Sequence, residues 1–266
     1  MRSVLLILIL VVSCGKHTSS HKTVEVRNEP IKPPPTQETT PEPTETPDDV
    51  NAADLVKIND LLPTMYYIPQ EARTNCKGKY GGTDYNGSER SQILATDGSV
   101  IATVCTRFYR VLLMEGSAVL SNHFSGDVAV NVAGTVNGIR RFHILDRCTY
   151  GEGVKRDLCL LPYHTLATDN KVHAIGDIIF VPKAVGLLLP DGTKHEGYFI
   201  VRDTGGAFEG VGAQRVDMFT GLDPDYSNVF QRAGFHHKAP MNAFKIKGQS
   251  AEVIKDKLRA RFGELY

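Results

Sequence analysis

The sequence lacks a surplus of charge of either sign. Its 30 Lys and Arg residues are balanced by 30 Asp and Glu residues, so the formal net charge is zero. Nowhere along the chain is a cluster of basic residues interleaved with aromatic ones. Proteins that bind nucleic acid use such basic surfaces to neutralise phosphates. We therefore expect no nucleic-acid partner.

The common metal and nucleotide motifs are also missing. The sequence contains no His-Glu-x-x-His, no Cys-x-x-Cys and no glycine-rich Walker loop. Each of these motifs places its ligands at a spacing that one metal ion or one phosphate group requires. The pair His236-His237 is adjacent, and the rings of neighbouring residues point apart unless the backbone bends. We therefore expect neither a metal ion nor a cofactor.

The N-terminus has the pattern of a targeting segment. Arg2 precedes nine apolar residues, 4–12, which are too few to cross a bilayer because a spanning helix needs about 20. The run ends at Val11-Val12-Ser13-Cys14, which resembles a bacterial lipobox whose cysteine, Cys14, carries the lipid. An ordinary secretory signal or a membrane anchor is the alternative. Gly15-Lys16 lacks the aspartate that retains lipoproteins in the inner membrane of enteric bacteria, which favours the outer membrane.

Residues 15–50 are predicted to form a disordered tether. They are rich in Pro, Thr and Glu and contain almost no large apolar side chains. Such a composition cannot bury enough surface to offset the entropy of ordering the chain. Proline favours extended conformations at roughly 3 Å per residue, so the tether could hold the folded part up to about 100 Å from a membrane.

Four cysteines remain after Cys14, and an even number in an exported chain favours two disulfides. Four cysteines allow three pairings. The short separations favour Cys76–Cys105 and Cys148–Cys159, and four buried free thiols are the alternative.

The stretch 51–245 contains many short apolar runs separated by turn signals such as Asp97-Gly98, Asn137-Gly138 and Asp191-Gly192. Short strands at close spacing are typical of an all-β barrel or sandwich. We interpret 108–114 as one of these strand-like runs. Residues 56–62 read as a short helix that stops at Pro63.

The C-terminal residues, 246–266, are predicted to form a helix. Ile254, Leu258 and Phe262 recur at intervals of four before Gly263, so they share one helix face. Ser250 is the candidate N-cap.

The most informative motif is Asp203-Thr204-Gly205-Gly206-Ala207, which directly follows the strand-like run 197–202. Paired glycines permit backbone angles and close approaches that a Cβ would forbid. A second acid, Asp217, lies in Arg215-Val216-Asp217-Met218-Phe219. Because catalytic groups are often mounted on loops held by a rigid sheet, we expect both carboxyls to converge on one site.

These residues resemble the three-aspartate (3D) domain of the membrane-bound lytic transglycosylase A family and related cell-wall lytic proteins. The resemblance is strong over 161–221 and weak upstream as far as Thr64, and the third aspartate corresponds to Asp169. The segment from Gly210 to Asp217 is about three residues longer than the usual pattern. The resemblance implies a six-stranded double-psi β-barrel with loop elaborations, which pattern alone does not predict.

It also implies an enzyme that acts as a monomer on peptidoglycan glycan strands in the bacterial envelope, facing the periplasm. Such an enzyme cleaves the MurNAc–GlcNAc β-1,4 bond and forms 1,6-anhydro-MurNAc. Asp217 corresponds to the acid/base, and Asp203 and Asp169 to supporting carboxyls. Thr64, Tyr66 and the two motif glycines, Gly205 and Gly206, are the candidate substrate-binding residues. A plain turn role for Asp169 and core packing for Tyr66 are the alternatives.

Two other functions remain open. Related double-psi barrels in expansins loosen polysaccharides without cutting them, so a non-catalytic wall-binding protein is the main alternative. Asp203-Thr204-Gly205 also matches the active-site triplet of aspartic proteases. Those enzymes need two triplets and this chain has one, so a protease would have to be a dimer.

Overall fold

The computed structural model describes residues 47–205, 208–210, 214–222 and 228–266. Cys14 and nearly all of the tether lie outside these residues, as does Gly206. The helices and strands are β1 (Leu55–Tyr66), β2 (Gly78–Tyr80), β3 (Thr83–Tyr85), β4 (Arg90–Leu94), β5 (Val100–Cys105), α1 (Thr106–Glu115), β6 (Ser117–Leu120), β7 (Val128–Val136), β8 (Ile139–Ile144), β9 (Thr165–Ala167), β10 (Ile178–Phe180), β11 (Tyr198–Asp203), β12 (Arg215–Phe219), α2 (Val229–Arg232), β13 (Met241–Ile246) and α3 (Gly248–Phe262). Short 3-10 turns lie at Ala52–Asp54, Glu71–Arg73, Pro182–Ala184 and Gly263–Leu265.

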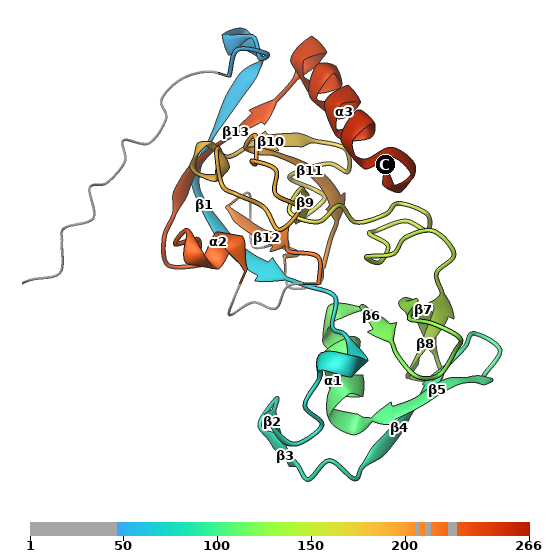
Figure 1. Cartoon of the computed structure of the whole chain (residues 1–266). Helices are drawn as coiled ribbons and strands as arrows, with labels where there is room; N and C mark the ends of the chain where they lie inside the picture. The colour runs from blue at the N-terminus through green and yellow to red at the C-terminus, as the bar shows by residue number, and fades with distance from the viewer. Residues whose placement is uncertain (1–46, 206–207, 211–213, 223–227) are drawn as a thin grey trace, which may run out of the picture. The chain divides into compact units, whose positions relative to one another are not determined.

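Six strands close into a barrel in the order β1-β12-β9-β11-β10-β13 (Figure 1). Two pairs of neighbours, β1 with β12 and β9 with β11, are parallel, and the other four are antiparallel. Parallel neighbours need crossover connections, which are the basis of the double-psi arrangement. The expected β-barrel with a C-terminal helix is therefore confirmed.

The barrel interior is filled by side chains that alternate along its strands. Leu166 of β9, Val201 of β11, and Val216 and Met218 of β12 are all fully buried in one cluster. Successive residues of a strand point to opposite faces, so the residues between these face outward. This alternation determines which side of the barrel carries the candidate site.

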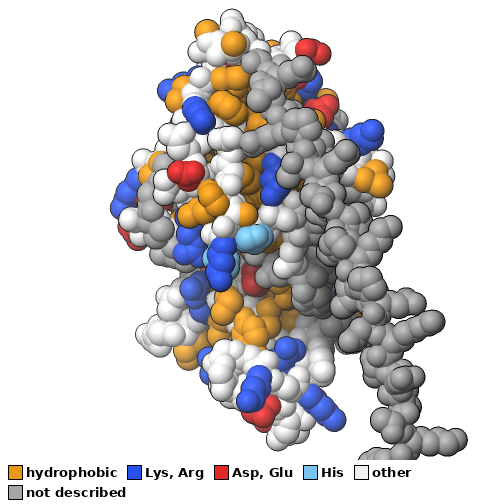
Figure 2. Space-filling model, turned by 90° about the vertical axis from the view of Figure 1, so that its left-hand side faces the viewer, with side chains coloured by type: hydrophobic (Ala, Val, Ile, Leu, Met, Phe, Trp, Pro, Cys, Tyr) orange, Lys and Arg blue, Asp and Glu red, His pale blue; other side chains and the backbone are white. Residues whose placement is uncertain are grey.

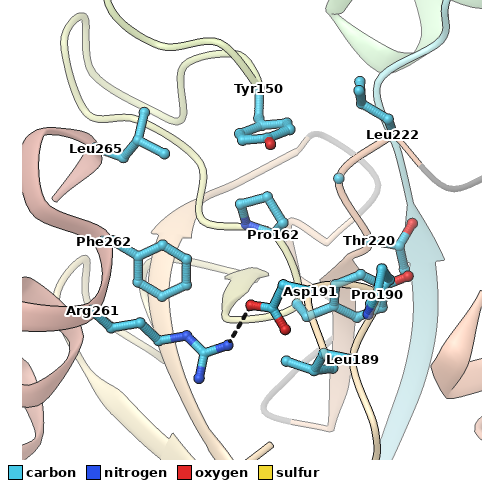
Figure 3. A pocket seen from close by; sticks show the side chains of 12 residues that line it. Tyr150, Pro162, Leu189, Pro190, Asp191, Thr220, Leu222, Arg261, Phe262 and Leu265 are labelled. Atoms are coloured by element: carbon cyan, nitrogen blue, oxygen red, sulfur yellow. Dashed lines mark hydrogen bonds and ion pairs between the residues drawn. The ribbon is translucent and has the colours of Figure 1, made fainter. Parts of the chain in front are cut away.

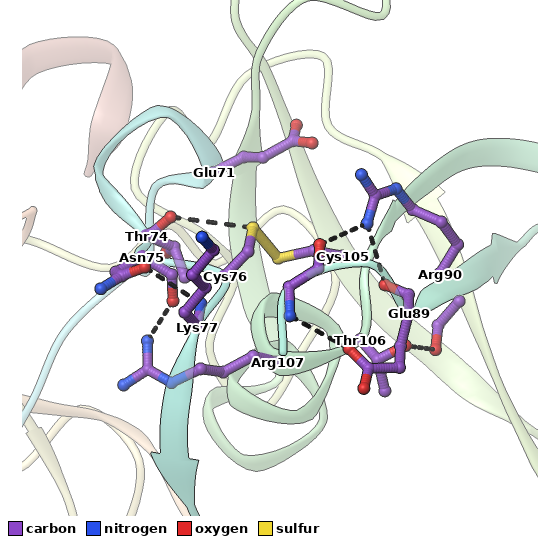
Figure 4. Close-up of a disulfide and its surroundings, with 12 residues drawn as sticks. Glu71, Thr74, Asn75, Cys76, Lys77, Glu89, Arg90, Cys105, Thr106 and Arg107 are labelled. Carbon is purple, nitrogen blue, oxygen red and sulfur yellow. Dashed lines mark hydrogen bonds between the residues drawn. A yellow bond between two sulfur atoms is a disulfide. The ribbon is translucent and has the colours of Figure 1, made fainter. Parts of the chain in front are cut away.

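The chain leaves the barrel after β1 and returns at β9. In between, β2 pairs with β3, β4 with β5, and β6, β7 and β8 form a three-stranded sheet. This insertion has its own core around Phe108, Leu112 and Phe142. Two disulfides, Cys76–Cys105 (Figure 4) and Cys148–Cys159, lie in it, with Cα atoms 5.8 and 4.8 Å apart.

Two predicted elements are wrong. Residues 108–114 belong to helix α1, because Phe108, Val111 and Leu112 recur at helical spacing and are all buried on one face. Residues 56–62 belong to strand β1. A shift of register between Ile58 and Leu61 interrupts the strand alternation there, which is why the sequence did not read as a strand.

Helix α3 covers the outer face of β10, β11 and β13, where Ile254 and Leu258 are buried against the barrel (Figure 1). Gly263 ends the helix as predicted, but Ser250 is not its N-cap. Ser250 is the third helical residue, and its hydroxyl donates to Asp54 Oδ2 (2.6 Å) and accepts from the Asn51 N–H (3.0 Å). In the described part of the chain, no helix combines the length and apolar character needed to span a membrane.

Part of the surface is visible in Figure 2. On the area that the grey atoms leave uncovered, Lys and Arg side chains are spread among hydrophobic and neutral ones.

Replacing Ile254 with Ala should destabilise the fold, because this fully buried side chain joins α3 to the barrel. The expected loss is about 2–4 kcal/mol, the range for large-to-small changes in a core. Val253→Ala is the matched control on the same helix, since Val253 is 37% exposed and should cost well under half as much. Urea unfolding of both variants measures the difference, and equal losses would contradict the packing described here.

Candidate active site

Strand β9 brings the two motif aspartates together. Its residue Ala167 is paired with Asp203 of β11 on one side and with Asp217 of β12 on the other. Asp217 is in turn paired with Thr64 of β1. Four strands thus place Asp203, Ala167, Asp217 and Thr64 in one row across the barrel wall. A β-bulge between Val201 and Asp203 sets the position of Asp203 in that row.

The row lies on the outer face of the barrel. Asp217 stands between Val216 and Met218, which point inward, and Ala167 packs in a separate outer cluster. This outer cluster contains Tyr66, Ile68, Val119, Leu160, Ala167, Phe208 and Phe219. Val119 comes from β6 of the insertion, so the two aspartates occupy the face of the barrel against which the insertion packs.

Tyr66 lies beside both carboxyls. Burial raises the pKa of its phenol well above the usual range, and the negative charges of Asp203 and Asp217 raise it further. The Tyr66 ring packs on Phe219 with centroids 5.0 Å apart, which fixes its position. The buried hydroxyl has no hydrogen bond of regular geometry among the described residues. Tyr66 therefore combines core packing with a polar group directed at the aspartates.

Asp203 is a half-buried carboxyl with a raised pKa. Burial raises the pKa of Asp203 to about 6, against the opposing effect of the Thr204 N–H, which donates to Oδ1 at 2.8 Å. The nearby Tyr66 hydroxyl opposes the rise as well. The Thr204 hydroxyl donates to the carbonyl of Thr168 (2.8 Å) and so ties the motif loop to β9. Asp203 is thus partly protonated near neutral pH.

Asp169 serves a different local purpose from the other two aspartates. Its carboxylate accepts the N–H groups of Lys171 and Gly210, both at 3.0 Å, and these bonds lower the pKa of Asp169. It therefore joins the turn after β9 to the loop that follows the Asp-Thr-Gly motif. Together with Thr204 and Gly205 it lines a polar hollow of about 390 Å³.

Sequence reasoning overlooked Arg215. It lies two residues before Asp217 on β12, so it shares the outward face, and its guanidinium lies 5.3 Å from the centre of the Phe208 ring. This stacking holds Phe208, which follows the motif glycines, against the outer cluster. The signal that could have identified Arg215 is its spacing, because a residue two positions from Asp217 on a strand has its side chain on the same face.

Comparison with known proteins gives a family match for residues 164–239. Residues 164–239 match the model of the 3D domain, so this part of the chain is a 3D domain, as the motif residues predicted. No curated protein matches the sequence. The matched segment contains β9 to β12 and all three aspartates.

Several solved structures are similar at low identity. E. coli MltA with bound chitohexaose is 14% identical with a TM-score of 0.46, covering 73% of this chain and 75% of that one. A membrane-bound lytic murein transglycosylase from Agrobacterium tumefaciens is 15% identical with a TM-score of 0.44, covering 78% and 79%. The lytic transglycosylase LtgG of Burkholderia pseudomallei is 16% identical with a TM-score of 0.34, covering 70% and 71%. At these values the likenesses identify no individual residue in this chain.

The raised pKa of Asp203 predicts a pH-dependent gain in stability for Asp203→Asn. Between about pH 4 and pH 6 the folded protein binds the Asp203 proton more tightly than the unfolded chain does, so wild-type stability falls as pH rises through this window. Asn does not titrate, so the variant avoids this loss in the free energy of unfolding, which is at most on the order of 3 kcal/mol. The variant should therefore be more stable than wild type above pH 6 and similar to it at pH 4 and below.

Urea unfolding at pH 4 and pH 8 measures this effect. Asp84→Asn, at an exposed position of β3, is the matched control and should show no such difference. A variant of Asp203 that is less stable than wild type at pH 8 would refute the assigned direction of the pKa shift.

Proposed function

We propose that the protein is a lytic transglycosylase that cleaves the β-1,4 bond between MurNAc and GlcNAc in peptidoglycan and leaves a 1,6-anhydro-MurNAc end. One observation carries the proposal: Asp203 and Asp217 flank Ala167 on the same outer face of the barrel, beside Tyr66. The 3D domain match over the same residues supports it.

The reaction needs one group that first gives and then takes a proton. We assign this role to Asp217. Its protonated carboxyl gives a proton to the glycosidic oxygen of the departing GlcNAc while the C1–O4 bond breaks. The Asp217 carboxylate then accepts the proton of the MurNAc C6 hydroxyl, while the oxygen of that hydroxyl forms a bond to C1 of the same sugar. No water enters the product, and Asp217 regains its proton.

Asp203 and Tyr66 support this chemistry by controlling charge. Like charges held close together disfavour ionisation, so Asp203 promotes the protonated starting form of Asp217. The Tyr66 phenol stays neutral, because its raised pKa keeps the proton on the oxygen. Thr64 completes the row, with its hydroxyl donating to the Val216 carbonyl (3.3 Å).

Asp169 acts as a positioning residue in this proposal. It accepts the N–H of Gly210, the residue at which the segment that is about three residues longer than the usual 3D pattern, Gly210 to Asp217, begins. Gly205 lines the same polar hollow as Asp169, and the absence of a Cβ there leaves room for the Phe208 ring, which a Cβ would approach to 3.2 Å.

The proposed location follows from the N-terminus. Lipidation at Cys14 would anchor the protein in the bacterial envelope, with the outer membrane favoured by the residues after the cysteine. Residues 15–50 would then let the monomeric catalytic part reach glycan strands on the periplasmic side.

Replacing Asp217 with Asn should abolish most of the activity while leaving the fold intact. Loss of general acid/base catalysis costs roughly 10²–10⁴-fold in rate. Asp203→Asn should cost less, and its pH optimum should move downward because one negative charge beside Asp217 is gone. The release of soluble muropeptides from purified peptidoglycan between pH 4 and 8 measures both effects, with circular dichroism to check folding.

Asp84→Asn is again the control and should keep full activity, since it lies on β3 of the insertion. Full activity in Asp217→Asn would remove this residue from the mechanism. If Asp203→Asn instead showed the greater loss, the acid/base role would pass to Asp203, whose pKa of about 6 suits a proton donor.

Mass spectrometry of the released fragments tests the reaction type. Transglycosylation predicts anhydro ends, which are one water lighter than the reducing ends that a hydrolase leaves. Reducing ends alone would identify a hydrolase. Binding to peptidoglycan with no release of fragments, even at mildly acidic pH, would favour the expansin-like alternative.

A further inference from the structure

A second cavity lies at the end of the barrel where β12 ends and β9 begins. It has a volume of about 470 Å³, within the range of sites that hold small ligands. Figure 3 shows its walls: the rings of Tyr150, Pro162 and Phe262 and the side chains of Leu189, Leu222 and Leu265 surround the space. The proposed mechanism does not use this cavity.

One pair of opposite charges lies among these apolar walls. Arg261 of α3 donates to Asp191 Oδ2 at 2.9 Å (Figure 3) and to Thr193 Oγ1 at 2.5 Å. The Asp191 side chain is 56% exposed and the Arg261 side chain 26%, so a ligand can reach both. The combination suits a small ligand with methyl groups, a carboxylate and an ammonium group. A polysaccharide, which presents mainly hydroxyl groups, would need more hydrogen-bonding side chains than these walls offer.

The cavity adjoins the end of β12, the strand that carries Asp217. Thr220 and Gly221 directly continue β12 beyond Phe219, and they are tied to the end of β1 by Thr220 N–H to Tyr66 O (2.9 Å) and Ile68 N–H to Gly221 O (2.8 Å). Tyr150 and Leu222 pack on the outer cluster that also holds Tyr66 and Phe219. The cavity and the face that carries Asp217 therefore lie on either side of one side-chain cluster.

The separation of the two sites matches the reach of a short peptide. Gly221 is four residues beyond Asp217, which corresponds to at most about 13 Å along a strand. An extended peptide of four residues spans about 13–14 Å. A peptide branch attached to the sugar beside Asp217 can therefore reach Gly221 at the edge of the cavity that Arg261 and Asp191 also line.

We infer that this cavity binds the stem peptide of peptidoglycan, with Arg261 contacting a carboxylate of the peptide and Asp191 its free ammonium group. This inference rests on the proposed function, because it takes peptidoglycan as the substrate. It adds a specificity site that distinguishes peptide-bearing glycan from bare glycan.

Calorimetric titration of the full chain with two probes tests the inference. One probe is a disaccharide–tetrapeptide with a free amino group and free carboxylates, and the other is the same GlcNAc-MurNAc disaccharide without peptide. Neither probe contains a MurNAc–GlcNAc bond to cleave, so the measurement does not depend on turnover. The peptide-bearing probe should bind at least about tenfold more tightly, because charge-assisted hydrogen bonds are the strong ones.

Arg261→Gln and Asp191→Asn should each reduce that preference to threefold or less. Arg259→Gln is the matched control on the same helix: its side chain is 58% exposed, it does not line the cavity, and the preference should persist. Thermal unfolding checks that all three variants remain folded.

Equal binding of the two probes by the wild-type protein would overturn the inference, and so would no detectable binding of the peptide-bearing probe. A preference that survives both cavity variants would place the peptide elsewhere. The proposed function fails on a separate measurement, the activity of Asp217→Asn on whole peptidoglycan, so the two failures are distinguishable.

Discussion

The pairing of Ala167 with two aspartates is the constraint on which the candidate site depends. Strand β9 is only three residues long, yet it forms a parallel ladder with β11 and an antiparallel ladder with β12. Because Asp203, through the β-bulge, and Asp217 are both paired with Ala167, the carboxyls on either side share one face. A slip of one residue in either ladder would turn one carboxyl into the hydrophobic interior.

The interior packing enforces this register. Leu166, Val201, Val216 and Met218 fill the barrel from the three strands concerned, and all are fully buried. A slipped strand would expose these side chains and bury an acid, at a cost of several kcal/mol. The stability of the core and the geometry of the aspartates are therefore set by the same contacts.

The outer face adds chemistry that the barrel alone does not have. The insertion between β1 and β9 contributes Val119 and Ile68 to the cluster that buries Tyr66, and both the Tyr66 phenol and Asp203 are withdrawn from water. Burial then raises both pKa values, which keeps protons available on this face near neutral pH. The insertion thus acts on the site through desolvation as well as through shape.

The sequence by itself determined the site motif and the broad architecture. Asp203 and Asp217 were singled out from local pattern as acids at the ends of strand-like runs, Tyr66 was added by the resemblance to the 3D domain, and the match over 164–239 confirms that domain. Local pattern was misleading at two elements. In α1 a dense apolar run obscured the helical spacing, and in β1 a shift of register obscured the alternation of a strand. Only the tertiary structure decided that Ala167 separates the two carboxyls, that Asp169 is tied to the loop at Gly210, and that Arg261 meets Asp191 from 70 residues away. These are contacts between distant segments, and they depend on strand register and burial, which no short stretch of sequence encodes.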